Sequence, residues 1–248
     1  MRIVAVIPAR MGSGRLSGKV MLPILGKPLL GYLIDRVRLC RSIDEIVVAT
    51  SETSENDVIE DYCNSQGIGS FRGAEDDVLS RLDGVMRLTH ADTGVLLFGD
   101  GPLIDPKIID DCVNVFCDAG EYDLVSNDLT TNWPPGMEVE VFGTDAITDA
   151  NAFCLDPEVR EHGTLYIRTQ PERYRLYNID APHEYKRPDL SFEVDEAVDF
   201  HVIEKISTHF RYRTDFTLGE LIEFMDNNPN LREMTANVER RWKRYREK

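Results

Sequence analysis

Glycines and basic side chains are concentrated in residues 10–19, directly after an apolar run at residues 3–7. This short segment contains Gly12, Gly14 and Gly18 together with Arg10, Arg15 and Lys19. Glycines let a backbone turn back sharply and bring its N–H groups close to a ligand. Arginine and lysine side chains balance the negative charge of a polyphosphate. The pattern therefore predicts a phosphate-binding loop; the alternative is a surface turn with solvated basic residues.

Two well-known phosphate-binding motifs do not fit this loop. The P-loop pattern G-x-x-x-x-G-K-[ST] fails because Lys19 is followed by Val20. The dinucleotide pattern G-x-G-x-x-G fails because Ser17 stands where the third glycine is required. The sequence therefore supports neither a P-loop nucleotide hydrolase nor a Rossmann dehydrogenase.

Two aspartates follow apolar segments far from this loop in the sequence. Asp100 comes after residues 95–98 and has a glycine on each side, and Asp195 comes after residues 192–194. An acid at the carboxyl end of a strand is placed to meet a ligand or a metal ion. Magnesium prefers a few carboxylates together with substrate phosphates and water, so the two aspartates are candidate Mg²⁺ ligands. The alternative for Asp195 is a purely structural role as the cap of the helix expected after it.

Residues 7–19 read I-P-A-R-M-G-S-G-R-L-S-G-K and resemble the signature loop of sugar nucleotidyltransferases. They are most similar to the cytidylyltransferases that activate acidic sugars such as 3-deoxy-octulosonate and sialic acid. Within that group they resemble the spore coat polysaccharide branch, whose loop reads I-x-A-R-M-G-S-T-R-L-P-G-K. Gly14 and Ser17 replace the usual Thr and Pro. The resemblance implies that Arg10 and Lys19 are catalytic. It also implies that the nucleotide is bound by Pro8, Ala9, Arg10, Met11, Gly12, Ser13, Arg15 and Lys19.

The segments that contain the two aspartates carry the same resemblance. Residues 98–104, F-G-D-G-P-L-I, are similar to the family's G-D-C-P-L-I-D-P, with Gly101 in place of Cys. Residues 192–196, F-E-V-D-E, are similar to the family's L-T-V-D-T-P-E-D. The resemblance implies that Asp100 and Asp195 hold the magnesium ion.

Residues 71–81 resemble a family segment that reads R-G-S-E-D-D-V-L-x-R and lies next to the nucleobase. The resemblance implies that Arg72, Asp77 and Arg81 bind the nucleotide, through its base or its phosphates. Purely structural roles are the alternative for two of them. Asp77 can stabilise a helix N-terminus, and Arg81 can pair with a carboxylate on its own helix.

Two glutamates and a histidine are candidates for sugar binding. Glu138 and Glu140 lie two residues apart in M-E-V-E-V-F, so they share one face of the expected strand. This segment is similar to the family's D-V-E-V-F. His162 falls in R-E-H, which resembles a family motif that precedes T-P-Y, although Leu165 replaces the Pro here. The alternatives are a solvent-facing or dimer-rim strand face and a structural histidine.

Composition limits the classes of partner and the cellular location. The 248 residues include 28 basic and 44 acidic side chains, for a formal net charge of −16, which disfavours nucleic-acid or anionic-membrane binding. No apolar run approaches the ~18 residues of a membrane span, and the N-terminus leads straight into a strand and a loop. We therefore expect neither a transmembrane helix nor a signal peptide. The five cysteines include no C-x-x-C pair, which indicates free thiols in a reducing cytoplasm.

A parallel sheet is the element that must position these residues. The apolar segments 3–7, 46–50 and 95–98 are typical of buried strands, and helical spacing of apolar residues separates them. Strand and helix thus alternate through roughly the first hundred residues, which predicts an α/β fold with right-handed crossovers. We expect a doubly wound, mainly parallel sheet, the Rossmann-like fold of nucleotidyltransferases, with a small strand extension.

The second half of the sequence is less regular. We expect a half-exposed strand at residues 137–142, because its polar and apolar residues alternate strictly, and a helix at 161–169. Two further strands are expected at 174–179 and 191–194, and helices at 196–208 and 218–227 complete the list of expected elements.

The chain is expected to form one domain over residues 1–248. It would carry a small extension around residues 128–180 and a charged C-terminal tail at 237–248. An exposed alternating strand in the extension favours pairing with a second copy, so a homodimer is expected.

The resemblance covers most of the chain and implies a magnesium-dependent enzyme that joins CTP to a sugar and releases pyrophosphate. The sugar would be an acidic component of a surface polysaccharide. One alternative is a nucleotidyltransferase that uses UTP or GTP. Another is a catalytically silent protein that binds nucleotide sugars.

Overall fold

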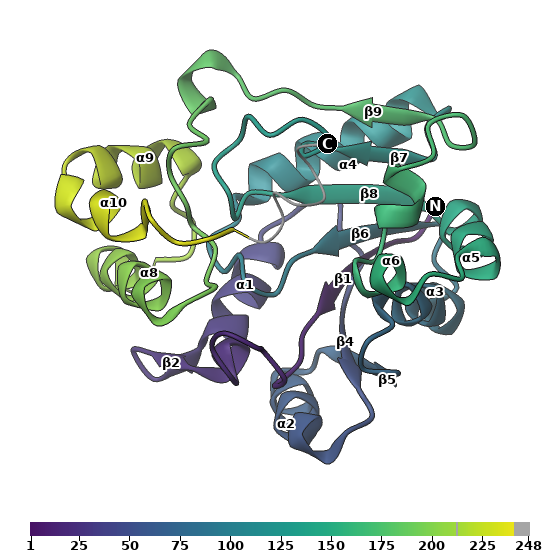
Figure 1. Ribbon diagram of the computed structural model, residues 1–248, viewed down its shortest axis with the longest axis horizontal. Coiled ribbons are helices and arrows are strands. Elements are labelled where there is room, and N and C mark those ends of the chain that lie inside the picture. Colours follow the sequence, from purple (N-terminus) through teal and green to yellow (C-terminus); the bar gives the residue numbers. More distant parts are fainter. Residues whose placement is uncertain (212, 241–248) are drawn as a thin grey trace.

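A seven-stranded sheet forms the centre of the protein, in the order β5-β4-β1-β6-β8-β7-β9 (Figure 1). The computed structural model describes residues 1–211 and 213–240. The strands are β1 (Ile3–Pro8), β4 (Glu45–Ser51), β5 (Gly69–Gly73), β6 (Thr93–Leu97), β7 (Leu124–Ser126), β8 (Val139–Gly143) and β9 (Leu176–Asn178). The four strands from β5 to β6 run parallel, and β8 lies antiparallel between β6 and β7. The predicted mainly parallel α/β sheet is therefore confirmed.

Helices cover both faces of this sheet, because successive side chains of each strand point to opposite sides. In β1, Ala5 and Ile7 belong to one apolar core, while Val4 and Val6 belong to the other. The first core also contains side chains of α1, α2, α4, α8 and α9, and the second contains side chains of α3 and α5. This two-sided burial explains why β1 has an unbroken apolar sequence.

The helices have well-defined sequence signals at their ends. Pro106 opens α4 at its first turn, Asp77 caps α3 by accepting a bond from Ser80 N–H, and Thr217 and Glu220 form a capping box on α9. The α-helices are α1 (Leu29–Val37), α2 (Asp57–Gln66), α3 (Val78–Thr89), α4 (Pro106–Ala119), α5 (Thr144–Phe153), α6 (Pro157–Glu161), α7 (Leu165–Arg168), α8 (Ala197–Phe210), α9 (Leu218–Asp226) and α10 (Pro229–Thr235).

Short elements complete the description. A hairpin of β2 (Pro23–Ile24) and β3 (Lys27–Pro28) follows the glycine-rich loop, and its turn residues Leu25 and Gly26 both have positive φ. Three 3₁₀ helices, η1 (Lys19–Met21), η2 (Ser54–Asn56) and η3 (His183–Tyr185), lie in connections. The described residues contain no helix that is both long and apolar enough to cross a membrane.

The prediction of a half-exposed strand at 137–142 is wrong. The strand observed there, β8, pairs with β6 on one side and β7 on the other, and it is buried along residues 139–142 because Val139 and Val141 pack into one apolar core and Phe142 into the other. Its Glu140 is acidic and nevertheless buried. Strict alternation is typical of a strand with one wet face, but an internal strand can also alternate when its polar residues have partners inside the protein. The argument for a homodimer through this strand therefore loses its basis.

Two other expected elements differ from those observed. The helix expected at 161–169 is present only as the shorter α7: α6 ends at Glu161, and Gly163, whose φ of 61° is left-handed, lies in the turn between the two helices. Residues 191–194 do not form a strand. They are held by isolated backbone bonds, from Phe192 N–H to the Pro135 carbonyl and from Val194 N–H to the Asp100 carbonyl. The strand expected at 174–179 is present as the shorter β9.

Residues 128–180 were expected as a small extension. They contribute β8 and β9 to the main sheet, and α5 covers one of its faces. Of the tail expected at 237–248, residues 241–248 lie outside the described residues.

Candidate active site

The glycine-rich loop leaves the carboxyl end of β1 and folds back on itself. The carbonyl of Met11 accepts bonds from the N–H groups of Ser13 and Gly18, and the N–H of Met11 donates to Asn56 Oδ1. Gly12 has no room for a side chain, because a Cβ there would lie 2.6 Å from Glu75 Oε1. These contacts give the loop a fixed path from the exit of β1 to Lys19, at the start of η1.

Lys19 brings the two predicted metal ligands together. Its Nζ lies 2.9 Å from Asp100 Oδ2 and 3.4 Å from Asp195 Oδ1, and it also donates to the Val194 carbonyl. Burial would lower the pKa of Lys19, but the two carboxylates outweigh burial and raise it. The loop and the two acids therefore meet at one point, as predicted, but only Asp100 follows a strand of the sheet; Asp195 is brought there by the bond from Val194 N–H to the Asp100 carbonyl.

Further cations surround Asp195. Arg15 lies 2.6 Å from Asp195 Oδ1, and Arg240 lies 3.4 Å from Asp195 Oδ2. The N–H of Asp195 donates to Asp199, which together with Glu196 forms a capping box at the start of α8. The cap of α8 is therefore Glu196 and not Asp195, so the structural alternative for Asp195 is wrong, and the carboxylate of Asp195 faces the loop.

Arg10 lies on the other side of the loop and is paired with acids. It contacts Asp76 at 2.6 Å and Glu161 at 2.7 Å, and it donates to the Glu75 carbonyl. Burial opposes its charge, but Asp76 and Glu161 raise its pKa. Arg10 therefore joins the loop to the start of α3 and the end of α6.

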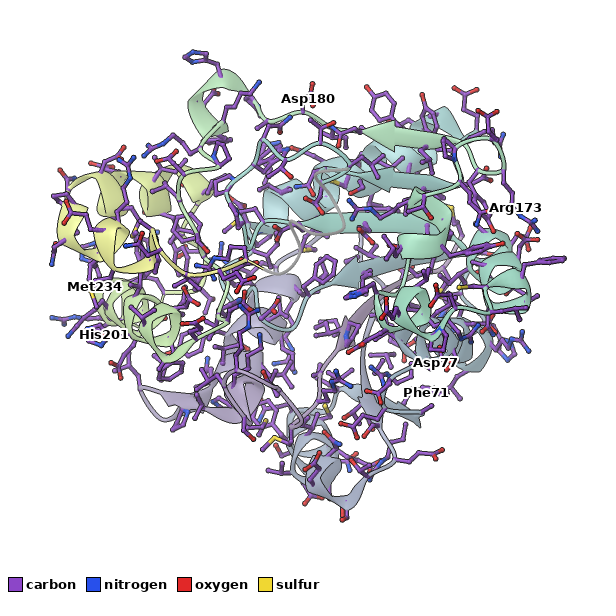
Figure 2. All side chains as sticks on the ribbon, in the orientation of Figure 1. Phe71, Asp77, Arg173, Asp180, His201 and Met234 are labelled. Atoms are coloured by element: carbon purple, nitrogen blue, oxygen red, sulfur yellow. The ribbon has the colours of Figure 1, made fainter. Side chains whose placement is uncertain are left out.

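The three candidates from residues 71–81 have partners within the protein. Arg72 on β5 pairs with Asp57 and Glu60 of α2, and it does not line the pocket beside the loop. Asp77 caps α3 and pairs with Arg160 at 2.8 Å; Figure 2 labels it near the N-terminal end of α3.

Arg81 is buried on α3. It donates to the carbonyls of Ala74 and Glu75, and burial lowers its pKa. These contacts hold the turn before α3 in place. The structural alternative for Arg81 named a carboxylate on its own helix, whereas the observed hydrogen-bond acceptors are backbone carbonyls.

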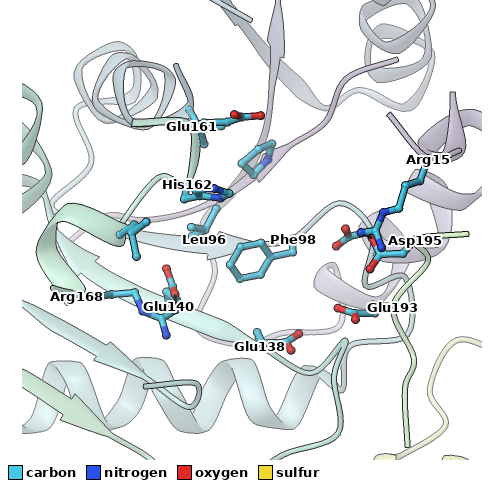
Figure 3. A pocket seen from close by; sticks show the side chains of 14 residues that line it. Arg15, Leu96, Phe98, Glu138, Glu140, Glu161, His162, Arg168, Glu193 and Asp195 are labelled. Atoms are coloured by element: carbon cyan, nitrogen blue, oxygen red, sulfur yellow. Dashed lines mark hydrogen bonds and ion pairs between the residues drawn. The ribbon is translucent and has the colours of Figure 1, made fainter. Parts of the chain in front are cut away.

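A pocket of about 270 Å³ lies beside the loop (Figure 3). Phe98 stands between Arg15 and Asp195 on one side and Glu140 and Arg168 on the other. The predicted sugar-binding residues all line the pocket. Its complete lining is Pro8, Arg15, Val78, Leu96, Phe98, Asp100, Glu138, Glu140, Glu161, His162, Leu165, Arg168, Glu193 and Asp195.

Glu140 and Arg168 form a buried ion pair at one end of the pocket. Arg168 also contacts Asp128, at 3.1 Å, and donates to its carbonyl, while Glu140 accepts a bond from the Thr164 hydroxyl. Burial disfavours the charge of Arg168, but Glu140 and Asp128 raise its pKa. Glu140 therefore shapes this end of the pocket through its partners and also presents a carboxylate to it.

Sequence reasoning did not select several residues of this site. Phe98 was noted only as part of a strand, and Arg240 only as part of a charged tail. Glu193 was overlooked, although a glutamate in the apolar segment F-E-V-D is a usable signal. Burial and the nearby carboxylates of Glu138, Asp100 and Asp195 raise the pKa of Glu193 to about 8, against the opposing effect of Arg240.

Comparison with known proteins gives the family of the chain. A model of the cytidylyltransferase family matches residues 4–221. The chain is 33% identical to the spore coat polysaccharide biosynthesis protein SpsF of Bacillus subtilis over 234 residues, which cover 92% of this chain and 95% of that protein. It is 39% identical to the 3-deoxy-manno-octulosonate cytidylyltransferase of Zea mays over 123 residues, 45% of this chain and 38% of that protein.

The fold is also shared with a solved structure. A cytidylyltransferase from Leptospira borgpetersenii serovar Hardjo-bovis superposes with a TM-score of 0.88 at 28% identity, over 97% of this chain and 99% of that one. The family match spans most of the sequence and includes the loop, Asp100 and Asp195. The resemblance seen in the loop is therefore confirmed, and the chain belongs to the cytidylyltransferase family.

Proposed function

We propose that this cytidylyltransferase joins CTP to a sugar, with Mg²⁺ as cofactor, to give a CMP-sugar and pyrophosphate. The observation that carries the proposal is the contact of Lys19 Nζ with both Asp100 and Asp195, at the end of a glycine-rich loop and beside a pocket. Membership of the cytidylyltransferase family supports CTP as the nucleotide. The names of the relatives from Bacillus subtilis and Zea mays support a sugar as the acceptor.

The residues around Lys19 fit a magnesium site. Asp100 and Asp195 are the carboxylates, and a common contact with one ammonium group shows that they share a small region. Mg²⁺ is usually held by one or two carboxylates and completes its octahedron with phosphate oxygens and water. When bound, Mg²⁺ neutralises phosphate charge in the reaction.

The loop cations are placed to bind the triphosphate. Lys19, Arg10 and Arg15 belong to this loop, and each is already held in contact with a carboxylate. Phosphate oxygens would replace some of these carboxylate contacts, so little new ordering of long side chains is needed when CTP binds. Fixed cations around the phosphates stabilise charge that develops during transfer.

The reaction is an in-line substitution at the α-phosphorus. A sugar hydroxyl oxygen forms the new bond to phosphorus, the bond to the bridging oxygen of the β-phosphate breaks, and pyrophosphate leaves with that electron pair. The hydroxyl proton is released to solvent. The contribution of the protein is to hold the two reactants close together and to balance charge.

The sugar would occupy the part of the pocket lined by Glu138, Glu140 and His162. Carboxylates and an imidazole can accept hydrogen bonds from sugar hydroxyls. The resemblance to cytidylyltransferases for acidic sugars leads us to propose an acidic sugar of a surface polysaccharide. Arg72, Asp77 and Arg81 are proposed to act near the nucleotide, with Arg81 and Asp77 shaping the turn before α3.

We further propose that the chain acts in the cytoplasm, without nucleic-acid or membrane partners. The homodimer expected from the sequence stays a prediction, which β8 no longer supports because it lies inside the sheet. The net charge of −16 and the five free thiols support the location and the exclusion of anionic partners. Size-exclusion chromatography with light scattering tests the dimer.

A pyrophosphate-release assay with each of the four nucleoside triphosphates and a panel of acidic, neutral and amino sugars tests the function. We expect turnover with CTP and an acidic sugar, and its loss in Asp100→Asn. Lys27→Ala is the matched control, because Lys27 also pairs with an aspartate but lies on the hairpin outside the pocket. Equal turnover with UTP would contradict the choice of nucleotide. Binding of CTP without turnover of any sugar would favour a catalytically silent protein.

A further inference from the structure

The C-terminal segment returns to the active site after α10. Figure 1 shows the chain running back from α10 toward the central sheet. Within this segment the side chain of Arg240 is only 6% exposed. Its guanidinium lies 2.7 Å from Asp199, 3.3 Å from Glu193 and 3.4 Å from Asp195. Arg240 also lies beyond residue 221, where the match to the family model ends.

The tightest contact of Arg240 is with Asp199. Two nitrogens of the guanidinium donate to the two oxygens of this carboxylate, at 3.0 and 2.7 Å. A bidentate pair of this kind fixes orientation as well as charge. Asp199 in turn accepts bonds from the N–H groups of Asp195 and Glu196, at 3.0 and 2.9 Å. The position of the Asp195 backbone thus depends on Asp199, and the position of Asp199 depends on Arg240.

The same segment is tied to the glycine-rich loop. Arg15 donates to the carbonyl of Glu239 and pairs with Asp195 Oδ1. Arg15 therefore connects the loop to Asp195 and to the residue before Arg240. Arg240 does not line the pocket, so it acts on the pocket through the residues that it holds.

We propose that Arg240 is a positioning residue of the active site, which holds Asp195 in its metal-binding orientation through Asp199. The C-terminal segment then forms part of the catalytic machinery, although it lies outside the region that the family model matches. This inference rests on the proposed role of Asp195 as a ligand of Mg²⁺.

Two effects of removing Arg240 have opposite signs. Loss of a positive charge near Asp195 would by itself strengthen the attraction of the site for a cation. Loss of the Asp199 contact would free Asp195 and weaken metal binding, as removal of residues that orient metal ligands generally does. The long Asp195 contact and the short bidentate Asp199 contact make orientation the larger effect. The sign of the change in metal affinity therefore tests the proposal.

The experiment compares Arg240→Ala with the conservative Arg240→Lys and with Arg232→Ala as a matched control. Arg232 belongs to the nearby α10 and pairs with Asp189 at 2.9 Å, away from Asp195. Mn²⁺ is titrated into the full-length protein with and without CTP and followed by calorimetry, and KM is measured for Mg²⁺, CTP and sugar. We expect Arg240→Ala to lose about 10- to 100-fold in Mn²⁺ affinity and to raise KM for Mg²⁺ similarly, with KM for the sugar unchanged. Arg240→Lys should recover only part of the lost Mn²⁺ affinity, because lysine cannot form the bidentate contact with Asp199.

A double-mutant cycle separates positioning from general loss of stability. Asp199→Asn should reproduce the metal defect, and the double variant should be no worse than Arg240→Ala alone, because both act through one contact. If Arg240→Ala does not fold, Arg240→Lys and Asp199→Asn carry the test. The proposal would be overturned if Arg240→Ala bound Mn²⁺ with the same affinity as Arg232→Ala, or more tightly than the wild type. Asp195→Asn is the reference: wild-type metal affinity in that variant would instead contradict the proposed metal site itself.

Discussion

Lys19 stands between two carboxylates, and these neighbours decide its charge. Its side chain is 12% exposed, which alone would favour the neutral amine. Asp100 and Asp195 reverse that preference and raise its pKa, so Lys19 stays an ammonium at neutral pH. Arg10 is held in the same way by Asp76 and Glu161. The loop therefore presents permanent positive charge to a nucleotide, although the chain as a whole is acidic.

Replacement of either cation should weaken CTP binding while the fold persists. A charge-assisted contact with phosphate is worth ~1.5–3 kcal/mol, so Lys19→Ala and Arg10→Ala should each lose about ten- to a hundredfold in affinity. Calorimetry with CTP measures the loss. Lys107→Ala, which removes an exposed lysine paired with Asp111, should bind CTP as the wild type does. Wild-type affinity in both loop variants would refute the assignment of the loop as the triphosphate site.

At the scale of elements, the turn before β8 supports the segment that carries Asp195. Gly136 has a φ of 94°, and a Cβ there would lie 2.6 Å from the carbonyl carbon of Phe192. The neighbouring Pro135 carbonyl accepts a bond from Phe192 N–H at 2.7 Å. The backbone at Phe192 and Glu193 thus passes directly against this glycine, two to three residues before Asp195.

Gly136→Ala should therefore damage both stability and activity. Positive φ costs a non-glycine residue roughly 1 kcal/mol, and a clash with backbone atoms adds to that cost because backbone cannot rotate away. Gly120→Ala is the control, because Gly120 also has positive φ but a Cβ there would meet no atom within 4 Å. Chemical denaturation and kcat for both variants measure the difference. The expectation fails if Gly136→Ala is no less stable and no less active than Gly120→Ala.

At the scale of the whole molecule, Arg36 joins the N-terminal half to the C-terminal helices. It is fully buried on α1 and donates to the carbonyls of Ile104, Thr214 and Phe216. Its guanidinium also lies over the Phe216 ring, 4.0 Å from the centroid. Burial lowers the pKa of Arg36 to about 10, so it remains charged at neutral pH. One side chain thus donates hydrogen bonds to three carbonyls from two separate segments of the chain.

Arg36→Ala should cost about 3 kcal/mol or more of unfolding free energy, because it leaves buried carbonyl groups unpaired and opens a cavity. Arg36→Lys should not restore this stability, since a single ammonium cannot reach three acceptors held in a planar arrangement. Arg38→Ala, two residues further along the chain and exposed, should change stability by less than about 1 kcal/mol. Urea denaturation of the three variants measures these changes. Equal losses of unfolding free energy in Arg36→Ala and Arg38→Ala would contradict the role of Arg36 in joining the two parts of the chain.

Local patterns in the sequence determined the first half of the fold and the centre of the site. β1 is predictable because a strand buried on both faces needs an unbroken apolar run. The loop after it is predictable because glycines and cations in one short segment have few other uses. Asp100 is predictable at this edge of the sheet, since it follows the parallel strand β6, whereas Asp195 reaches the same point without a strand before it. These inferences need only short-range information and one topological rule.

Only the tertiary structure decided the features that depend on distant partners. β8 alternates like an exposed strand but is buried, because its apolar residues pack into the two cores of the sheet and Glu140 pairs with Arg168. Residues 192–194 lack a strand partner and are held instead by single bonds to two loops. Arg240 lies in a stretch whose composition indicates a solvated tail, yet its charge is balanced by three acids far away in sequence. Burial of a charge depends on the groups that the fold places around it, and a sequence read in order does not show those groups together.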